Sequence, residues 1–184
     1  MQTQTKICGL LNRRANEILE IEAKYYELLK HEYLVRSVEI KKIPNFWVKC
    51  IQNHHTLPTI INSKDWEIFS YISDLTVDEY TSRQKVKTYK LTLDFEKNPY
   101  FNNNSLWIAV NNDEQQSLSA SGVEFKGNYS LKEFHDTRQS FFSIFFGVYD
   151  GSVLTDPGFV FDIVDGIRID LWEDPFKYYE ISNQ

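Results

Sequence analysis

The stretch KKIPNFWVKCIQNHHTLPTII, residues 41–61, decides the fold because it separates a long helical pattern from a compact body. Pro44 cannot continue a helix, since it has no backbone N–H and its ring clashes with the preceding turn. Before it, residues 7–42 contain no other proline and one glycine, Gly9. From Leu75 onward, the apolar spacing changes from a helical period to alternation. We therefore expect a long N-terminal helix followed by a body of mixed structure.

The long helix, assigned to residues 1–43, carries apolar residues at the three-four spacing of a coiled-coil seam. A helix of ~36 residues is ~54 Å long, which is more than a domain of this size covers. We predict that the seam pairs with a second copy of the chain; the alternative is a long intramolecular core helix. A second apolar line, made of Leu10, Leu29, Tyr33 and Ile40, is expected to face the body. The predicted dimerisation residues are Ile7, Leu11, Ile18, Ile21, Tyr25, Leu28 and Val35.

The body, residues 44–184, contains four segments that alternate like strands of an antiparallel sheet with one wet face. They lie at 75–80, 85–95, 105–110 and 122–126, with a polar loop at 111–121. Helices are expected at 46–55, 65–72, 131–139, 140–148 and 157–172, the third of these body helices being LKEFHDTRQ. The order of a long helix, short helices, strands and further helices predicts an α+β fold, a four-stranded antiparallel sheet flanked by helices.

The charge is unevenly distributed along the chain. The formal net charge is −6, but residues 1–43 carry +2 and residues 148–184 carry −6. An acidic chain is a poor general binder of nucleic acid and suits a basic protein partner. The acidic residues near the C-terminus form either a solvated helix face or a binding surface. The candidate contacts are Asp78, Glu79, Asp150, Asp156, Asp162, Asp165, Asp170, Glu173 and Asp174.

Motifs that carry enzymatic chemistry are missing from the sequence, so we expect no enzyme, no cofactor and no metal site. The two cysteines are 42 residues apart and form no ligand spacing. His54 and His55 are adjacent, so on a helix they would point about 100° apart and share a metal poorly. No apolar run has the length of a signal peptide or of a membrane span, which indicates the cytoplasm or the nucleus.

Five segments occur together in the order typical of one family. They are ILEIEAKYYELLK (18–30), KKIPNFWVKCIQNHHTLPTII (41–61), EKNPYFNNNSL (96–106), SFFSIFF (140–146) and DLWEDPFKYYE (170–180). The chain thereby resembles the SET/nucleosome assembly protein (NAP) family of histone chaperones, and the SET branch in particular. The resemblance covers about 170 residues.

The resemblance implies a headphone-shaped homodimer. Its long helices pair antiparallel, and each α+β body forms an "earmuff" whose acidic underside binds core histones without ATP. The histone partners are the flanking dimers, the central tetramer of the nucleosome, or both; the slightly basic helix also permits weak DNA contact. A nuclear and cytoplasmic location is implied, without a visible nuclear localisation signal. The alternatives are an inhibitor of a serine/threonine phosphatase or of histone acetylation, and a dimerisation scaffold.

Overall fold

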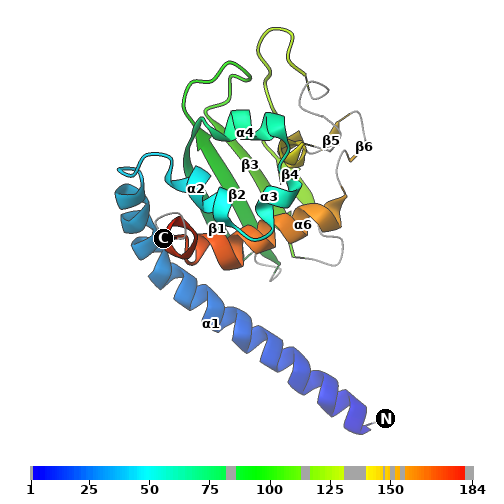
Figure 1. The fold of residues 1–184 in the computed structure, drawn as a ribbon. Helices are drawn as coiled ribbons and strands as arrows, with labels where there is room; N and C mark the ends of the chain where they lie inside the picture. The colour runs from blue at the N-terminus through cyan, green and yellow to red at the C-terminus, as the bar shows by residue number, and fades with distance from the viewer. Residues whose placement is uncertain are drawn as a thin grey trace.

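A computed structural model describes residues 2–81, 86–112, 117–130, 140–146, 148–149, 152–153 and 156–180. Helix α1 (Gln2–Ile40) has 39 residues and projects far beyond a compact body (Figure 1). At 1.5 Å per residue it is ~58 Å long. It ends just before Pro44, as the missing N–H of proline requires. The predicted α+β architecture is confirmed.

The sheet of the body has four antiparallel strands in the order β1-β2-β3-β4. They are β1 (Ile72–Thr81), β2 (Lys87–Phe95), β3 (Ser105–Asn111) and β4 (Leu118–Ala120). Along β2, Leu91 and Leu93 are fully buried, whereas Lys90 and Thr92 on the opposite face are half-buried. One face of the sheet therefore packs on the core, as the alternation predicted.

The predicted fourth strand at residues 122–126 is wrong. The strand that pairs with β3 is Leu118–Ala120, which lies in the segment expected to be a polar loop. Gly122 follows with φ of +71°, a left-handed conformation that glycine adopts without strain and that ends the extended run. Beyond it only an isolated bridge joins Phe101 to Phe125.

Short helices cover the inner face of the sheet. The elements before the sheet are α2 (Phe46–Asn53), α3 (Leu57–Ile60) and α4 (Ser63–Phe69); those after it are η1 (Phe141–Phe146), β5 (Val148–Tyr149), β6 (Ser152–Val153), α6 (Pro157–Gly166), η2 (Ile167–Trp172) and α7 (Phe176–Glu180). Segment 140–148 forms a 3-10 helix and a short strand rather than one helix. The helix at 157–172 is confirmed, with a π-helical second half. The predicted helix at 131–139 lies outside the described residues.

The buried carboxylate of Asp65 ties α4 to η1. It accepts hydrogen bonds from the backbone N–H of Asn62 and of Phe141, at 3.0 and 2.8 Å, and from the Ser140 hydroxyl. Asn62 in turn accepts from the Asp65 N–H, so the two residues form a reciprocal capping box. Asn62 is thus the N-cap of α4, whose first residue is Ser63.

Arg36 joins α1 to the body. Its guanidinium lies 4.7 Å from the Tyr33 ring centre and 4.5 Å from that of Trp172. It also donates hydrogen bonds to the backbone oxygens of Trp172 and Glu173, at 2.6 and 3.1 Å. These carbonyls lie at the end of η2, where helix carbonyls lack partners and favour a cation.

The body-facing side of α1 differs in part from the predicted line. Ile40 is buried and Tyr33 packs against the core, as expected. Leu29 is 45% exposed but lines a hollow together with Glu79 and Trp172 of the body, so it faces the body without being buried, whereas Leu10 is 65% exposed. Tyr26 also belongs to the side of α1 that faces the body, because Tyr26, Tyr33 and Ile40 follow one another at steps of seven residues.

All seven predicted dimerisation residues are exposed in the single chain, from 44% for Ile7 to 61% for Leu28.

Among the described residues, no helix is long and apolar enough to cross a membrane.

We predict that Arg36→Met lowers the free energy of unfolding by about 2 kcal/mol, because one charge-assisted anchor and two ring contacts are lost. Denaturant titration followed by circular dichroism measures this change. Arg13→Met is the matched control, since Arg13 makes only an exposed ion pair with Glu17, and it should change stability by less than ~0.5 kcal/mol. Equal stability of both variants would refute the anchoring role.

Candidate functional site

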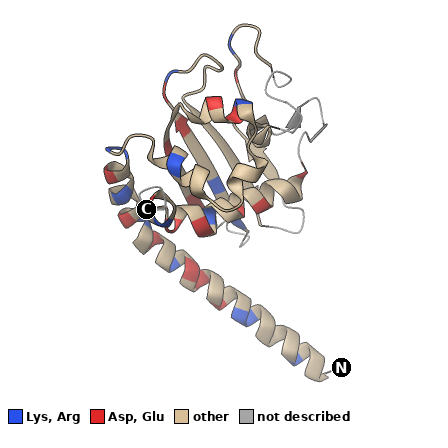
Figure 2. Cartoon of the chain, in the orientation of Figure 1, with Lys and Arg blue, Asp and Glu red and all other residues tan. Residues whose placement is uncertain are grey.

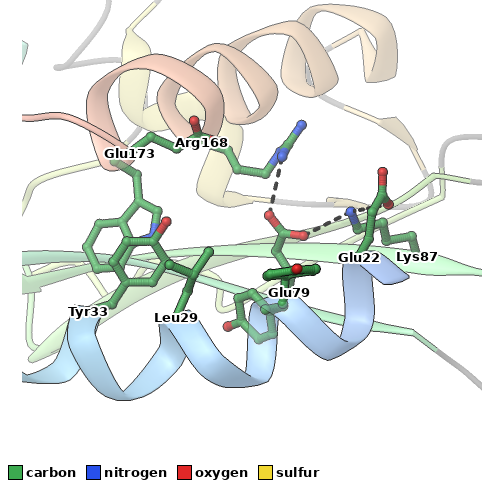
Figure 3. A pocket seen from close by; sticks show the side chains of 10 residues that line it. Glu22, Leu29, Tyr33, Glu79, Lys87, Arg168 and Glu173 are labelled. Carbon is green, nitrogen blue, oxygen red and sulfur yellow. Dashed lines mark hydrogen bonds and ion pairs between the residues drawn. The ribbon is translucent and has the colours of Figure 1, made fainter. Parts of the chain in front are cut away.

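The predicted acidic residues separate into three environments. The first surrounds Arg168, whose Nη1 lies 3.2 Å from Glu79 Oε1 (Figure 3). Its Nη2 lies 2.7 Å from Asp165 Oδ1. Lys87 Nζ lies 3.0 Å from Glu79 and 3.0 Å from Glu22. Two of the predicted contacts, Glu79 and Asp165, are thus neutralised within the chain.

The Arg168 cluster consists of Arg168, Glu79, Asp165, Lys87 and Glu22. It is partly buried, and the lower local dielectric constant strengthens its ion pairs. The side chains of Glu79, Lys87 and Arg168 are only 16–17% exposed. Burial lowers the pKa of Lys87, but the hydrogen bonds that its ammonium donates to Glu79 and Glu22 raise it more, so the net shift is upward. The cluster joins α1, the sheet and η2, and we interpret its carboxylates as structural.

The second environment surrounds Asp170. Its carboxylate lies 3.2 Å from Lys177 Nζ, 3.4 Å from His54 Nε2 and 3.7 Å from His55 Nδ1. Burial raises the pKa of Asp170, but its hydrogen bonds with Tyr178 and Lys177 lower it more, so the net shift is downward. Asp170 is therefore ionised and already has a cation.

The prediction that the two histidines point apart is wrong. Their rings are stacked with centres 4.4 Å apart, and His54 Nε2, His55 Nδ1 and an Asp170 oxygen lie within 4.8 Å of one another. Helix α2 ends at Asn53 and His54 has ψ of 140°, so the 100° rotation per residue of a helix does not apply.

The arrangement of His54 disfavours a metal ion nevertheless. Its Nδ1 accepts hydrogen bonds from the backbone N–H groups of Thr56 and Leu57, both at 3.2 Å. In the neutral ring the proton then resides on Nε2, the atom that faces Asp170. A metal at Nε2 would require the ring to lose this proton as well, which makes His54 a poor ligand.

The third environment is open to solvent. Asp78, Asp156, Asp162, Glu173 and Asp174 are exposed, and among the described residues no cation lies within 4.0 Å of their carboxylates. Asp78 on β1 accepts a hydrogen bond from the Tyr26 hydroxyl at 3.4 Å. The other four lie on or beside α6 and η2. Asp150 lies outside the described residues.

Helices α6 and η2 lie along the lower side of the body in Figures 1 and 2, the side toward which the free half of α1 projects. Four of the unpaired carboxylates lie on or beside these two helices. This surface, made of Asp156, Asp162, Glu173 and Asp174, is named the open acidic surface below.

Comparison with known proteins assigns the family. The nucleosome assembly protein (NAP) family model matches residues 34–132, which is more than half of the chain. This chain belongs to the nucleosome assembly protein family. NAP1-related protein 2 of Oryza sativa subsp. indica is 31% identical over 176 residues, covering 90% of this chain and 68% of that protein. Protein SET of Drosophila melanogaster is 30% identical over 198 residues, covering 98% and 71%. The family resemblance is confirmed.

Solved NAP-fold structures agree with the architecture. Nucleosome assembly protein S of Plasmodium falciparum superposes with a TM-score of 0.71 at 22% identity, covering 97% of this chain and 96% of that one. The Vps75 histone chaperone superposes with a TM-score of 0.73 at 14% identity, covering 100% and 99%. At these identities the likeness concerns the fold alone.

We predict that acidification destabilises the wild-type protein more than His54→Asn. Burial, and next the neighbouring His55, lower the pKa of His54 in the folded state. Below the ordinary value of ~6.5 the unfolded chain binds the extra proton first, so stability is lost as the pH falls toward the lower folded pKa. Asparagine keeps a local acceptor for the two N–H groups but does not titrate.

Thermal melts between pH 7.5 and 5 measure the effect. His31→Asn, which removes an exposed histidine from α1, should follow the wild type. The proposed role of His54 fails if His54→Asn shows the same loss of stability as the wild type over this range.

Proposed function

We propose that this protein is a histone chaperone that holds core histones on its open acidic surface. The observation that carries the proposal is the set of unpaired carboxylates on α6 and η2 in a chain of the NAP family. Histones are strongly cationic, and an acidic surface competes with DNA phosphates for their Lys and Arg side chains. Transfer follows relative affinity, so no ATP is needed.

Ion pairs within the chain make some of the candidate histone contacts less favourable than others. Glu79, Asp165 and Asp170 already have internal cations, so a histone would gain less from them. Asp156, Asp162, Glu173 and Asp174 are free to exchange water for a cationic partner. Such contacts are solvent-exposed and screened by salt, which makes binding sensitive to ionic strength.

We further propose that residues 1–43 form the dimerisation helix and residues 44–184 the histone-binding body. The exposed apolar residues of α1 form a stripe with heptad spacing, and such a stripe on a soluble protein is usually covered by a partner. A second copy of α1 offers the complementary stripe. The proposed role implies that the protein acts in the nucleus and is also present in the cytoplasm.

We predict that Asp156→Asn, Asp162→Asn and Asp174→Asn together weaken histone binding about tenfold or more at moderate salt, since three unpaired charges are removed from one surface. Fluorescence titration with labelled core histone complexes at several salt concentrations measures the affinity. The matched control removes three exposed carboxylates elsewhere: Glu20→Gln, Glu39→Gln and Glu124→Gln. An equal loss in both variants would indicate a response to net charge and reject the site.

We predict that Ile21→Glu with Leu28→Glu converts the dimer to monomers, because two charges are placed in an apolar seam. Sedimentation velocity measures the mass. Asn12→Glu with Lys30→Gln changes the net charge equally but lies outside the seam, and it should leave the dimer intact. A dimer that persists in Ile21→Glu with Leu28→Glu would contradict this assignment.

A further inference from the structure

A groove runs between α1 and the body beside the open acidic surface. It consists of two adjoining hollows of about 220 and 260 Å³, which share Glu22, Tyr26, Glu79 and Lys87 as lining residues. Each is smaller than the ~300 Å³ that small-molecule sites usually reach. The groove therefore suits individual side chains of a polypeptide better than a compact ligand.

The walls of the groove combine aromatic and acidic groups. Leu29 and Tyr33 of α1, with Trp172, form an apolar half, and the Arg168 cluster forms a charged half (Figure 3). A long cationic side chain has matching parts, because its methylene stem packs on apolar surface while its charged head stays near carboxylates and ring faces. Arg36 already shows this mode, lying over the Tyr33 and Trp172 rings.

The charge of the groove also favours a cation. Four carboxylates line it, from Glu22, Glu27, Glu79 and Glu173, against the two cations Lys87 and Arg168. Both cations are held by ion pairs with Glu22, Glu79 and Asp165. Glu27 and Glu173 are exposed and have no cation within 4.0 Å among the described residues. The groove is thus left with unbalanced negative charge at its rim.

From these observations we infer that the groove between α1 and the body is a docking site for an extended, cationic protein segment, whose Lys or Arg side chains enter the two hollows. In an extended chain alternate residues point to the same side, so residues i and i+2 can occupy adjoining hollows. The inference rests on the proposed histone chaperone function and adds to it: globular histone surfaces meet the open acidic surface, and a flexible basic segment meets the groove.

The test uses the full chain as a dimer and two labelled peptides, (Ser-Arg)4 and (Ser-Gln)4, with fluorescence polarisation at low and moderate salt. We expect the arginine peptide to bind and the glutamine peptide not to bind. Leu29→Ser with Glu27→Gln should weaken the arginine peptide by on the order of fivefold or more. Leu10→Ser with Glu20→Gln makes the same chemical changes elsewhere on α1 and should stay within about twofold.

Photo-cross-linking of an arginine peptide that carries a benzophenone locates it independently of variant stability. Cross-links to residues 22–33, 79–81 or 172–173 support the inference, and cross-links confined to residues 156–162 overturn it. A shift of the Leu29→Ser, Glu27→Gln variant toward monomers, with no peptide bound by the wild type, would show that a second copy fills the groove and would also overturn it.

Histone binding measured on the same proteins distinguishes a failure of the proposed groove from a failure of the proposed chaperone function. Wild-type protein that binds core histones but not the arginine peptide refutes the groove and leaves the proposed function intact. Protein that binds neither refutes both. Equal loss of peptide affinity in the groove variant and its control likewise refutes the groove.

Discussion

The contact between Arg36 and the end of η2 is the constraint on which the arrangement of this protein depends. Much of α1 projects beyond the body, so a small number of contacts must fix the position of α1 relative to the body. Arg36 supplies several of them by stacking on Trp172 and by donating to two carbonyls that end a helix, and the Glu22–Lys87 ion pair adds another contact farther along α1. Because the carbonyls belong to the helix that carries the acidic residues, one contact orients both the rod and the acidic surface.

The acidic residues of this chain have different roles, although the sequence alone does not distinguish them. Glu79 and Asp165 pair with Arg168 and join the sheet, α6 and η2, and Lys87 links Glu79 to Glu22 of α1. Asp170 pairs with Lys177 beside two stacked histidines. Only carboxylates without such partners retain their full attraction for an external cation, since an internal ion pair must be broken before a new one forms. The count of 26 acidic residues therefore overstates the number of carboxylates that are available to a partner.

Much of the fold follows from local rules. The missing N–H of Pro44 ends α1, and the alternation along β2 identifies its buried face before any contact is known. The predictions that failed concern places where one local signal competes with another. Residues 122–126 alternate like a strand, but Gly122 turns the chain and a shorter, more polar segment pairs with β3 instead. His54 follows a helix in sequence but leaves it in space, so its ring stacks on His55.

The sequence by itself determined the long helix with its apolar stripe, the four-stranded α+β body and the concentration of acid near the C-terminus. These features depend on periodicity, on proline and on composition, which are properties of neighbouring residues. Only the tertiary structure decided which carboxylates are neutralised and where a groove forms. Glu79 meets Arg168 across 89 positions, and Arg36 meets Trp172 across 136. Such pairings depend on how α1 and η2 dock, and no local pattern in the chain encodes that distance.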